Sequence, residues 1–513
     1  MEWFESWALT LAVFLPVVGA VVVTVVPGDR DRLIRAVGLL FTGAALIVGI
    51  LMLFGYDFSA PGAFGDGQAA RALQYEVNLS WISVIDARYH VGIDGVSLPL
   101  LELTLLLGFL CMIYTWRWLP EPGRPKAFIA LLLLLQTGMS GTFIAFDLVL
   151  FFVFWELVLV PMYFLIGYWG YPGRREYAAI KFFLYTLFGS VFMLLAFLAM
   201  YFRSEPHTFD IIALQQAGFD PTFQNIAFIG LFLGFAIKVP MWPFHTWLPD
   251  AHTEAPTVGS VHLAGILLKM GTYGFVRIAL PILPEAARVW APWIGILAVI
   301  AIVYAALACL AQRDLKRLIA FSSVGHMGFV MLGIATLTDV GINAAIYGMV
   351  AHGIITGMLF FLAGSVHERY HTREIAEIGG GMLQKVPLMA SILAFTAIAS
   401  LGLPGLAGFW GEVMALLSAY SPAEGLSVTL FRVLMVFGGI GTIRTAGYFL
   451  WMLQRVNLGV VPDRWEPKRL ADVTAVEWVA WSPLLVATLL LGLAPGLVLG
   501  VTNDAVASLT GLF

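Results

Sequence analysis

The chain is a succession of long apolar runs separated by polar connections. Each run holds about 20 residues, which is enough for a helix to cross a hydrocarbon core of ~30 Å. The pattern therefore predicts about fourteen transmembrane helices, at residues 3–26, 33–54, 96–115, 126–145, 148–169, 178–202, 226–247, 257–280, 289–311, 317–335, 342–365, 387–420, 429–454 and 480–501.

The longer polar connections lie at 55–95, 203–225, 366–386 and 455–479, and none is large enough for a separate soluble domain. The first apolar run carries Glu2 and Glu5 where a signal peptide would carry basic residues. It also lacks a small-residue cleavage site. We therefore expect residues 3–26 to form the first retained span.

The distribution of lysine and arginine predicts the orientation of the spans, because cytoplasmic loops carry an excess of these residues. One set of alternate connections holds 18 of the 28 basic residues: 30, 32, 35, 117, 124, 126, 174, 175, 313, 316, 317, 369, 373, 385, 455, 464, 468 and 469. The other set holds 71, 88, 203, 277, 288 and 432, and four basic residues lie inside spans. With an even number of spans, both termini are predicted to lie on the periplasmic side.

Two parts of the chain resemble each other in sequence. The segment DLVLFFVFWELVLVPMYFLIG from Asp147 resembles DLKRLIAFSSVGHMGFVMLGI from Asp314. KFFLYTLFGS from Lys181 resembles HGIITGMLFFLAGS from His352 more weakly, and both copies continue to a Pro/Gly-interrupted span, at 239–243 and 401–408. The offset of five spans is odd, so the second copy is predicted to be inverted in the membrane. Inverted repeats with broken helices are typical of transporters, whose ion sites lie near the breaks.

These patterns predict an all-α polytopic membrane protein of about 14 transmembrane helices, with two inverted five-helix repeats, each containing one broken helix. The N-terminal helices 1–3 occupy residues 1–125, and the first repeat (helices 4–8) occupies 126–280. The second repeat (helices 9–13) occupies 289–454, and 455–513 form a cytoplasmic connection and helix 14.

Composition agrees with a membrane protein and excludes several classes of site. Hydrophobic residues make up 60% of the chain, charged residues 12%, and the mean hydropathy is +0.89. Soluble domains have about a quarter of their residues charged. Cys111 and Cys309 both lie in apolar runs, so no disulfide framework, zinc site or iron–sulfur cluster is expected. The glycine-rich stretches follow no strand, so no dinucleotide fold is expected.

Three ionisable residues lie deep inside predicted spans, where an unpaired charge is costly. Glu156 is about eight residues from the nearer end of its span, and Lys269 is about twelve from either end of its own. Lys238 is near the middle of its span, beside Pro240 and Pro243, which free backbone carbonyls that a lysine or water could bind. Snorkelling to the interface is the alternative for each lysine, but their depth favours a buried functional charge.

Histidines and one further carboxylate extend this group. His326 and His352 fall near mid-span, and histidine titrates near neutrality, so the two predict a proton relay; each could instead be a hydrogen-bonded packing residue. Glu412 follows the break at 401–408. The secondary candidates are His245 and His252 at the mouth of the first broken helix, and Lys181 and Arg444 near the cytoplasmic ends of their spans.

His367-Glu368-Arg369-Tyr370-His371 matches the H-E-x-x-H pattern of zinc proteases. It lies where a membrane helix meets a charged loop, and the sequence offers no third ligand. We expect no metal site there.

Over nearly its full length, the chain resembles the antiporter-like subunits of respiratory complex I. The motifs are WELVLVPMYFLIG, KVPMWPFHTWLPDAHTEAP, LLKMGTYG and RDLKRLIAFSSVGHMG. The family also includes subunits of multisubunit sodium/proton antiporters and of membrane-bound hydrogenases. Most paralogues carry a lysine in the second broken helix, where this chain has Glu412.

The resemblance implies a role for each residue of the site. Glu156 and Lys238 would form the input-side pair, and Lys269 would be the central lysine. His326 and His352 would be the polar link, and Glu412 the exit-side carboxylate.

The resemblance also implies partners and a location. The chain would be a proton-translocating subunit of NADH–quinone oxidoreductase that lies beside the antiporter-like subunits N and L. It would have no cofactor of its own, since NADH, FMN, the iron–sulfur clusters and quinone would be bound by other subunits. Separately, the high alanine and glycine content and the lack of a transit peptide favour a bacterial inner membrane over a mitochondrial one. No nucleic-acid partner is expected. The alternatives are a sodium/proton antiporter subunit and a membrane scaffold whose buried charges are structural.

Overall fold

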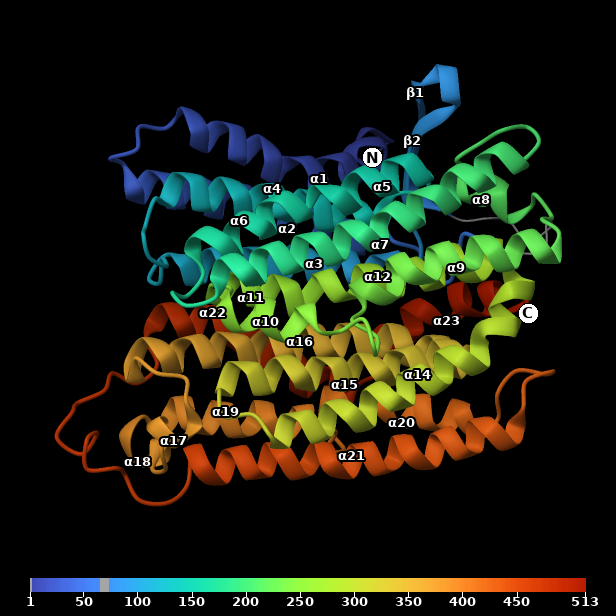
Figure 1. The fold of residues 1–513 in the computed structure, drawn as a ribbon. Coiled ribbons are helices and arrows are strands. Elements are labelled where there is room, and N and C mark those ends of the chain that lie inside the picture. Colours follow the sequence, from blue (N-terminus) through green and yellow to red (C-terminus); the bar gives the residue numbers. More distant parts are fainter. Residues whose placement is uncertain (1, 65–72) are drawn as a thin grey trace.

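The computed structural model describes residues 2–64 and 73–513, so Arg71 of the charge count lies outside the described residues. Long, roughly parallel helices form a single bundle (Figure 1). Within the described ranges, thirteen helices are long and apolar enough to cross a membrane. The prediction of a polytopic helical membrane protein is therefore confirmed.

The first half of the chain supplies the helices drawn in blue to green (Figure 1). They are α1 (Glu2–Val25), α2 (Asp31–Gly55), α3 (Ser97–Thr115), α4 (Pro125–Ile144), α5 (Leu148–Leu157), α6 (Leu159–Trp169), α7 (Arg175–Arg203), α8 (Ile211–Gln215), α9 (Pro221–Lys238), α10 (Trp247–Glu254), α11 (Thr257–His262), α12 (Leu268–Gly274) and α13 (Leu280–Ile282). The π-helical turns η2 (Leu263–Leu267) and η3 (Phe275–Ala279) join the last three into one span.

The second half supplies the helices drawn in yellow to red (Figure 1). They are α14 (Pro284–Leu310), α15 (Leu315–Ala335), α16 (Asp339–Tyr370), α17 (Ile375–Ile378), α18 (Met382–Lys385), α19 (Pro387–Ser400), α20 (Ala407–Tyr420), α21 (Val428–Val456), α22 (Ala475–Leu493) and α23 (Gly496–Thr510).

Four of the predicted spans are interrupted by proline or glycine. The span at 226–247 ends as α9 at Lys238 and resumes as α10, because Pro240 and Pro243 cannot continue the backbone ladder. The span at 387–420 is divided into α19 and α20 by a turn in which Gly402 and Gly405 have φ of +80° and +91°, values that glycine adopts without strain. Together α19 and α20 supply the fourteenth span. Pro161 removes the donor that would bond to the carbonyl of Leu157, and α5 ends there.

The last predicted span, 480–501, is wrong at its C-terminal end. Helix α22 stops at Leu493 and a separate helix, α23, begins at Gly496. Pro495 follows Ala494, whose backbone (φ −129°, ψ 66°) is not helical, in keeping with the bias of the residue before a proline away from the helical region. The apolar run therefore contains two helices.

The connection at 55–95 contains an antiparallel hairpin that the sequence analysis missed. Strand β1 (Gln74–Ile82) pairs with β2 (Ala87–Ile93) around the turn η1 (Ser83–Ile85). His90 of β2 anchors the hairpin through Asp210 at 2.6 Å and Glu76 at 2.9 Å. Burial opposes the charged form of His90, but these two carboxylates outweigh burial and raise its pKa.

The connections group at the two ends of the bundle as the charge count requires. At the end with most of the lysine and arginine, Arg35 donates to the carbonyl of Trp116 at 2.6 Å and Lys385 donates to that of Glu466 at 2.6 Å. Both termini lie at the other end, which carries the hairpin (Figure 1). We call these the basic end and the hairpin end.

Two aspartates cap helices in the same way at opposite ends. Asp147 caps α5 at the hairpin end, where its carboxylate also accepts from the Arg88 amide at 2.9 Å. Asp314 caps α15 at the basic end, where it pairs with Arg373 at 3.1 Å. Each begins the sequence segment that suggested a repeat, and each forms an isolated antiparallel bridge, with Asp210 and with Glu374 respectively. This placement agrees with an inverted repeat.

Candidate functional site

Helices from both halves of the chain bring four of the predicted site residues together in the bundle. Lys269 lies on α12, His352 on α16, His326 on α15 and Glu412 on α20. Helices α15, α16 and α20 pack against one another. The four residues come from segments that are far apart in sequence, so packing, not local structure, gathers them.

Lys269 is fully buried and hydrogen-bonded on two sides. Its Nζ lies 2.6 Å from Nδ1 of His352 and also donates to the carbonyl of Ala264. Ala264 lies in the π-helical turn η2, where the regular pattern of backbone bonds is interrupted. Lys269 thus has two acceptors and no carboxylate within 4 Å among the described residues.

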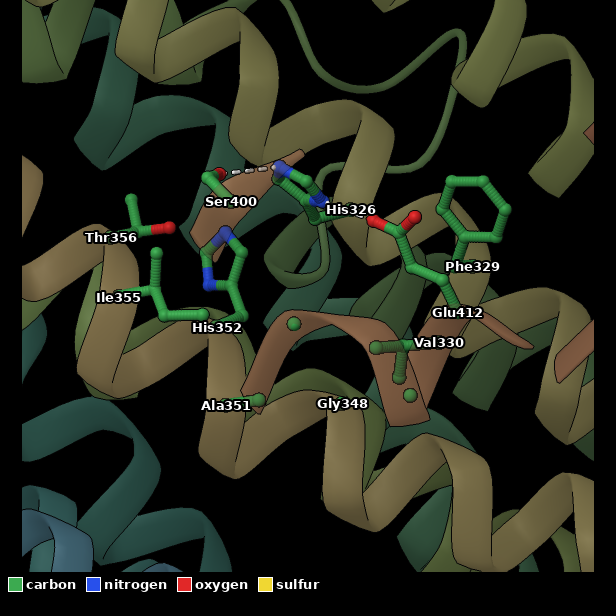
Figure 2. A pocket seen from close by; sticks show the side chains of 12 residues that line it. His326, Phe329, Val330, Gly348, Ala351, His352, Ile355, Thr356, Ser400 and Glu412 are labelled. Atoms are coloured by element: carbon green, nitrogen blue, oxygen red, sulfur yellow. Dashed lines mark hydrogen bonds and ion pairs between the residues drawn. The ribbon is translucent and has the colours of Figure 1, made fainter. Parts of the chain in front are cut away.

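His326 bridges two polar groups next to this pair. Its Nδ1 lies 3.0 Å from Oε1 of Glu412, and its Nε2 lies 3.0 Å from Oγ of Ser400 (Figure 2). The His326 and His352 rings are 5.7 Å apart between centroids. Gly402 of the break would carry a Cβ only 3.1 Å from the Glu412 carboxylate, so the glycine leaves room for it.

A cavity of about 30 Å³ lies among these side chains. Three polar atoms of residues that line it have no hydrogen-bond partner: Oε2 of Glu412, Nε2 of His352 and Oγ1 of Thr356. A space of this size that offers several polar partners can hold water. The arrangement is chemically suited to pass a proton, because each imidazole can accept at one nitrogen and donate from the other.

The structure does not bring Lys238 and Glu156 into contact. Lys238 is 2% exposed at the end of α9, and its Nζ lies 4.9 Å from the ring centroid of Trp155. In the described part of the chain, no ion pair within 4 Å joins it to Glu156, which is partly exposed on α5. The expected input pair is therefore not a direct ion pair, and Trp155 rather than the Glu156 carboxylate lies against the lysine.

The backbone carbonyls just before Pro240 are bound by groups other than Lys238. The carbonyl of Ala236, which Pro240 leaves without its usual donor, accepts from the Met241 amide at 2.9 Å. The indole of Trp247 donates to the carbonyl of Ile237 at 2.9 Å.

The secondary candidates have different environments. Lys181 pairs with Asp250 at 2.7 Å, and Arg317 binds the same carboxylate at 3.2 Å. His252 is fully buried, stacked on Phe360 at 4.5 Å, and neither ring nitrogen has a partner.

The other two secondary candidates are His245 and Arg444. His245 packs edge-on to Tyr304 at 4.9 Å, and its Nδ1 has no partner. Arg444 is partly buried on α21 and has no ion pair within the described ranges. Neither residue touches the cavity.

Sequence reasoning missed a buried ion pair and a buried carboxylate. Arg277 was counted as a loop residue, but it lies in η3 with a 1% exposed side chain and binds Asp94 at 2.5 Å. Burial opposes ionisation of Asp94, yet Arg277 holds its pKa below the usual value. Glu102 of α3 lies in an apolar surrounding, and its Oε1 has no partner. Glu102 and Arg277 both lie within predicted spans, 96–115 and 257–280, but near a span end, where sequence alone does not show whether a charge is buried.

No group of three His, Cys, Asp or Glu side chains able to hold a metal occurs in the parts of the chain that the structure describes. His367 and Glu368 lie in the last turn of α16, and His371 follows its end. The His367 ring packs edge-on to Tyr171 at 4.6 Å.

Comparison with known proteins agrees with this arrangement. The NADH-quinone oxidoreductase subunit M of Rhodobacter capsulatus is 40% identical, over 98% of this chain and 96% of its own length. The NAD(P)H-quinone oxidoreductase chain 4 of Gloeobacter violaceus is 37% identical, over 98% and 91%. Glu412 at the second break indicates this subunit M (chain 4) branch, and the names of both relatives confirm it.

Solved structures give the same fold. A chain of respiratory complex I from Thermus thermophilus with bound NADH superposes with a TM-score of 0.85 at 29% identity, covering 98% of this chain and 100% of that one. A chain of the Mrp complex from a Dietzia species shares the fold, with a TM-score of 0.80 at 23% identity, over 98% of this chain and 52% of that one. The model of the family described as NADH:quinone oxidoreductase/Mrp antiporter, TM, matches residues 145–438. The chain therefore belongs to the NADH:quinone oxidoreductase/Mrp antiporter transmembrane family.

Proposed function

We propose that this chain is the proton-translocating, subunit M-type membrane subunit of an NADH–quinone oxidoreductase. The observation that carries the proposal is the buried series of Lys269, His352, His326 and Glu412. Lys269 lies 2.6 Å from His352, and His326 lies 3.0 Å from Glu412. The centroids of the two histidine rings are 5.7 Å apart. Buried ionisable groups inside a membrane mark ion pathways by default. The names of the relatives support the same assignment.

The proposed path runs from Lys238 to Lys269 and then through the two histidines to Glu412. Glu156 would act on Lys238 through its charge, so movement or neutralisation of Glu156 would change how firmly Lys238 holds its proton. Moving one charge against 100 mV costs ~2.3 kcal/mol. Each unit of change in proton affinity supplies ~1.4 kcal/mol, so a shift of about two units is sufficient.

The electron-transfer chemistry would belong to other subunits. NADH, FMN, iron–sulfur clusters and quinone would bind there, and this chain would hold no redox cofactor. Its neighbours would be the antiporter-like subunits N and L, in a bacterial inner membrane. The division into residues 1–125, 126–280, 289–454 and 455–513 would follow the two repeats, and the capping by Asp147 and Asp314 at opposite ends supports it.

Orientation would place the basic end in the cytoplasm. Cysteine labelling in sealed vesicles tests this, because Cys111 and Cys309 are buried and leave little background. A cysteine at Asp463 should react from the cytoplasmic side and one at Asp86, in the hairpin turn, from the periplasmic side. Cytoplasmic labelling of Asp86→Cys would overturn the orientation.

Substitution of Lys269 tests the function itself. In membranes with equal amounts of assembled complex, Lys269→Ala should reduce proton pumping and quinone reduction by at least about tenfold, because proton transfer through a positioned group contributes on the order of 10²–10⁴-fold. Lys269→Arg should retain charge but release protons poorly. Lys126→Gln is the matched control, at a partly exposed lysine outside the cavity whose Nζ donates to the Thr24 carbonyl at 3.0 Å. Normal pumping by Lys269→Ala would sink the proposal.

Two other functions remain as outcomes of the same measurements. The fold shared with the Mrp complex favours a sodium/proton antiporter subunit as the second candidate, and sodium-dependent exchange by the purified assembly would identify it. In a scaffold with structural charges, Lys269→Ala would reduce assembly while each assembled complex pumped normally.

A further inference from the structure

A second cavity, of about 440 Å³, lies at the basic end, away from the histidine cluster. Its lining comes from the residues just after α3, the end of α16 and the connection that precedes α22. The proton path proposed above uses none of these residues.

The cavity is strongly cationic. Arg117, Lys468 and Arg469 line it, and none of the three has an acidic partner within 4 Å among the described residues. Glu368 is the one acidic residue in its lining. A fourth cation, Arg369, is already neutralised by Glu477 at 2.6 Å. Arg117, Lys468 and Arg469 are exposed, and their excess over the one carboxylate gives the cavity a positive potential that favours an anionic ligand.

The cavity wall is held in place before any ligand arrives. Besides binding Glu477, Arg369 donates to the carbonyls of Ala471 at 2.6 Å and Asp472 at 2.9 Å, which fixes the connection that carries Lys468 and Arg469. Trp465 is 6% exposed, and its indole donates to the carbonyl of Glu377 at 3.0 Å. Such preorganisation lowers the entropic cost of binding.

Two of the cations that line the cavity lie over tryptophan rings. Lys468 Nζ lies 4.5 Å from the ring centroid of Trp465, and the Arg117 guanidinium lies 5.1 Å from that of Trp118. The indole Nε1 of Trp118 is buried and has no acceptor. A phosphate oxygen is a suitable acceptor for this donor as well as for the guanidinium groups. Tryptophan is also enriched at the level of lipid headgroups.

An exposed apolar face leads away from the cavity along α22. This helix begins directly after Thr474, which lines the cavity. Val479, Val486, Leu490 and Leu493 are between 49% and 69% exposed. Their spacings of seven, four and three residues place them on one face of the helix. A soluble anion would use the cations alone, whereas a lipid would use both the cations and this face.

We propose that the cavity binds the phosphate of an anionic phospholipid whose acyl chains lie along the exposed face of α22. Arg117, Lys468, Arg469 and the Trp118 indole would contact the phosphate. The position at the basic end fits, because basic pockets between helices on the cytoplasmic side suit anionic headgroups. The proposal does not depend on the proton path.

The test uses the whole purified complex, reconstituted in phosphatidylcholine bilayers with a trace of photoreactive phosphatidylglycerol. Illumination followed by peptide mapping should place the label on α22 and near Trp118. The triple variant Arg117→Gln, Lys468→Gln, Arg469→Gln should need about a hundredfold more lipid for equal labelling, since each cation near the surface contributes about fivefold. The double variant Arg30→Gln, Arg32→Gln, at exposed residues of the same end, is the control.

Three arms separate the possible ligands. Photoreactive phosphatidylcholine should label α22 weakly, and millimolar inorganic phosphate should not displace phosphatidylglycerol. Displacement by inorganic phosphate would indicate a site for a soluble anion and overturn the lipid assignment. Crosslinks from Lys468 to a neighbouring subunit, with no lipid label, would indicate a protein interface and also overturn it. Equal labelling of the triple variant and the control variant would also overturn the lipid assignment.

Discussion

Lys269 and His352 form the one lysine–histidine side-chain hydrogen bond in the described parts of the bundle, with Nζ and Nδ1 2.6 Å apart and both residues buried. A lysine that faces an imidazole rather than a carboxylate has no adjacent negative charge to stabilise its protonated form. The pair can therefore hold one proton on either partner, which suits the step that connects the two halves of the bundle.

The first prediction concerns His352. His352→Gln keeps a hydrogen-bond acceptor for Lys269 but cannot relay a proton, so pumping should fall by at least about tenfold. The packing of α16 should be preserved, and the amount of assembled complex should be normal. Proton gradient and quinone reduction per assembled complex are the measurements. Thr356→Val, at another residue that lines the cavity, is the matched control and should be much milder.

Glu412 provides the second prediction. If a titratable group is needed beside His326, Glu412→Gln should reduce pumping by about tenfold or more while Glu412→Asp retains part of it. The shorter Asp carboxylate would lengthen the 3.0 Å contact with His326. Full pumping by Glu412→Gln would remove this carboxylate from the path.

Lys238 and Glu156 provide the third. Lys238→Ala removes the proton carrier, and Glu156→Gln removes the charge that acts on it, so each should slow quinone reduction as well as pumping in a tightly coupled complex. Glu156→Asp keeps the charge and should retain much of the activity. Because the two residues interact through space, Trp155→Leu should change the rate less than either loss of charge. Normal rates in Lys238→Ala and Glu156→Gln would make both residues structural.

The buried pair of Asp94 and Arg277 provides the fourth. Removing one partner leaves an uncompensated buried charge, at a cost of about 3–5 kcal/mol. Arg277→Gln and Asp94→Asn should therefore each lower the thermal stability of the complex, and the double variant should lose less than the sum. Additive losses would mean that the two side chains are not coupled.

His90 gives a prediction for pH dependence. Its pKa is raised in the folded protein, so its contribution to stability is present in full below the unfolded value of about 6.5 and is lost as pH rises through the folded pKa. Charge-assisted hydrogen bonds contribute about 1.5–3 kcal/mol. The thermal midpoint of the complex should exceed that of His90→Gln most at pH 6, and the difference should shrink toward alkaline pH. A difference that does not depend on pH would contradict the pairing with Asp210 and Glu76.

Sequence alone predicted most of the architecture. A bilayer requires about 20 apolar residues per helix, so each span can be recognised from the hydropathy of its own segment. The breaks at 239–243 and 401–408 can also be predicted from local sequence. Proline and glycine interrupt a helix through their own backbone properties, whatever the helix packs against. The same reasoning failed at Pro495, inside a continuous apolar run, and in the hairpin, whose strands lie outside the membrane pattern.

The buried residues of the site were predictable one by one, because a charge within an apolar run needs a reason. Their partners were not. His352 is 83 residues from Lys269 and Glu412 is 86 from His326, so only the packing of α12, α15, α16 and α20 decides which groups meet. Likewise, tertiary structure put Trp155, rather than the Glu156 carboxylate, against Lys238, and buried Arg277 against Asp94. Hydropathy is a property of single residues along the chain, whereas hydrogen-bond geometry depends on how helices distant in sequence pack together.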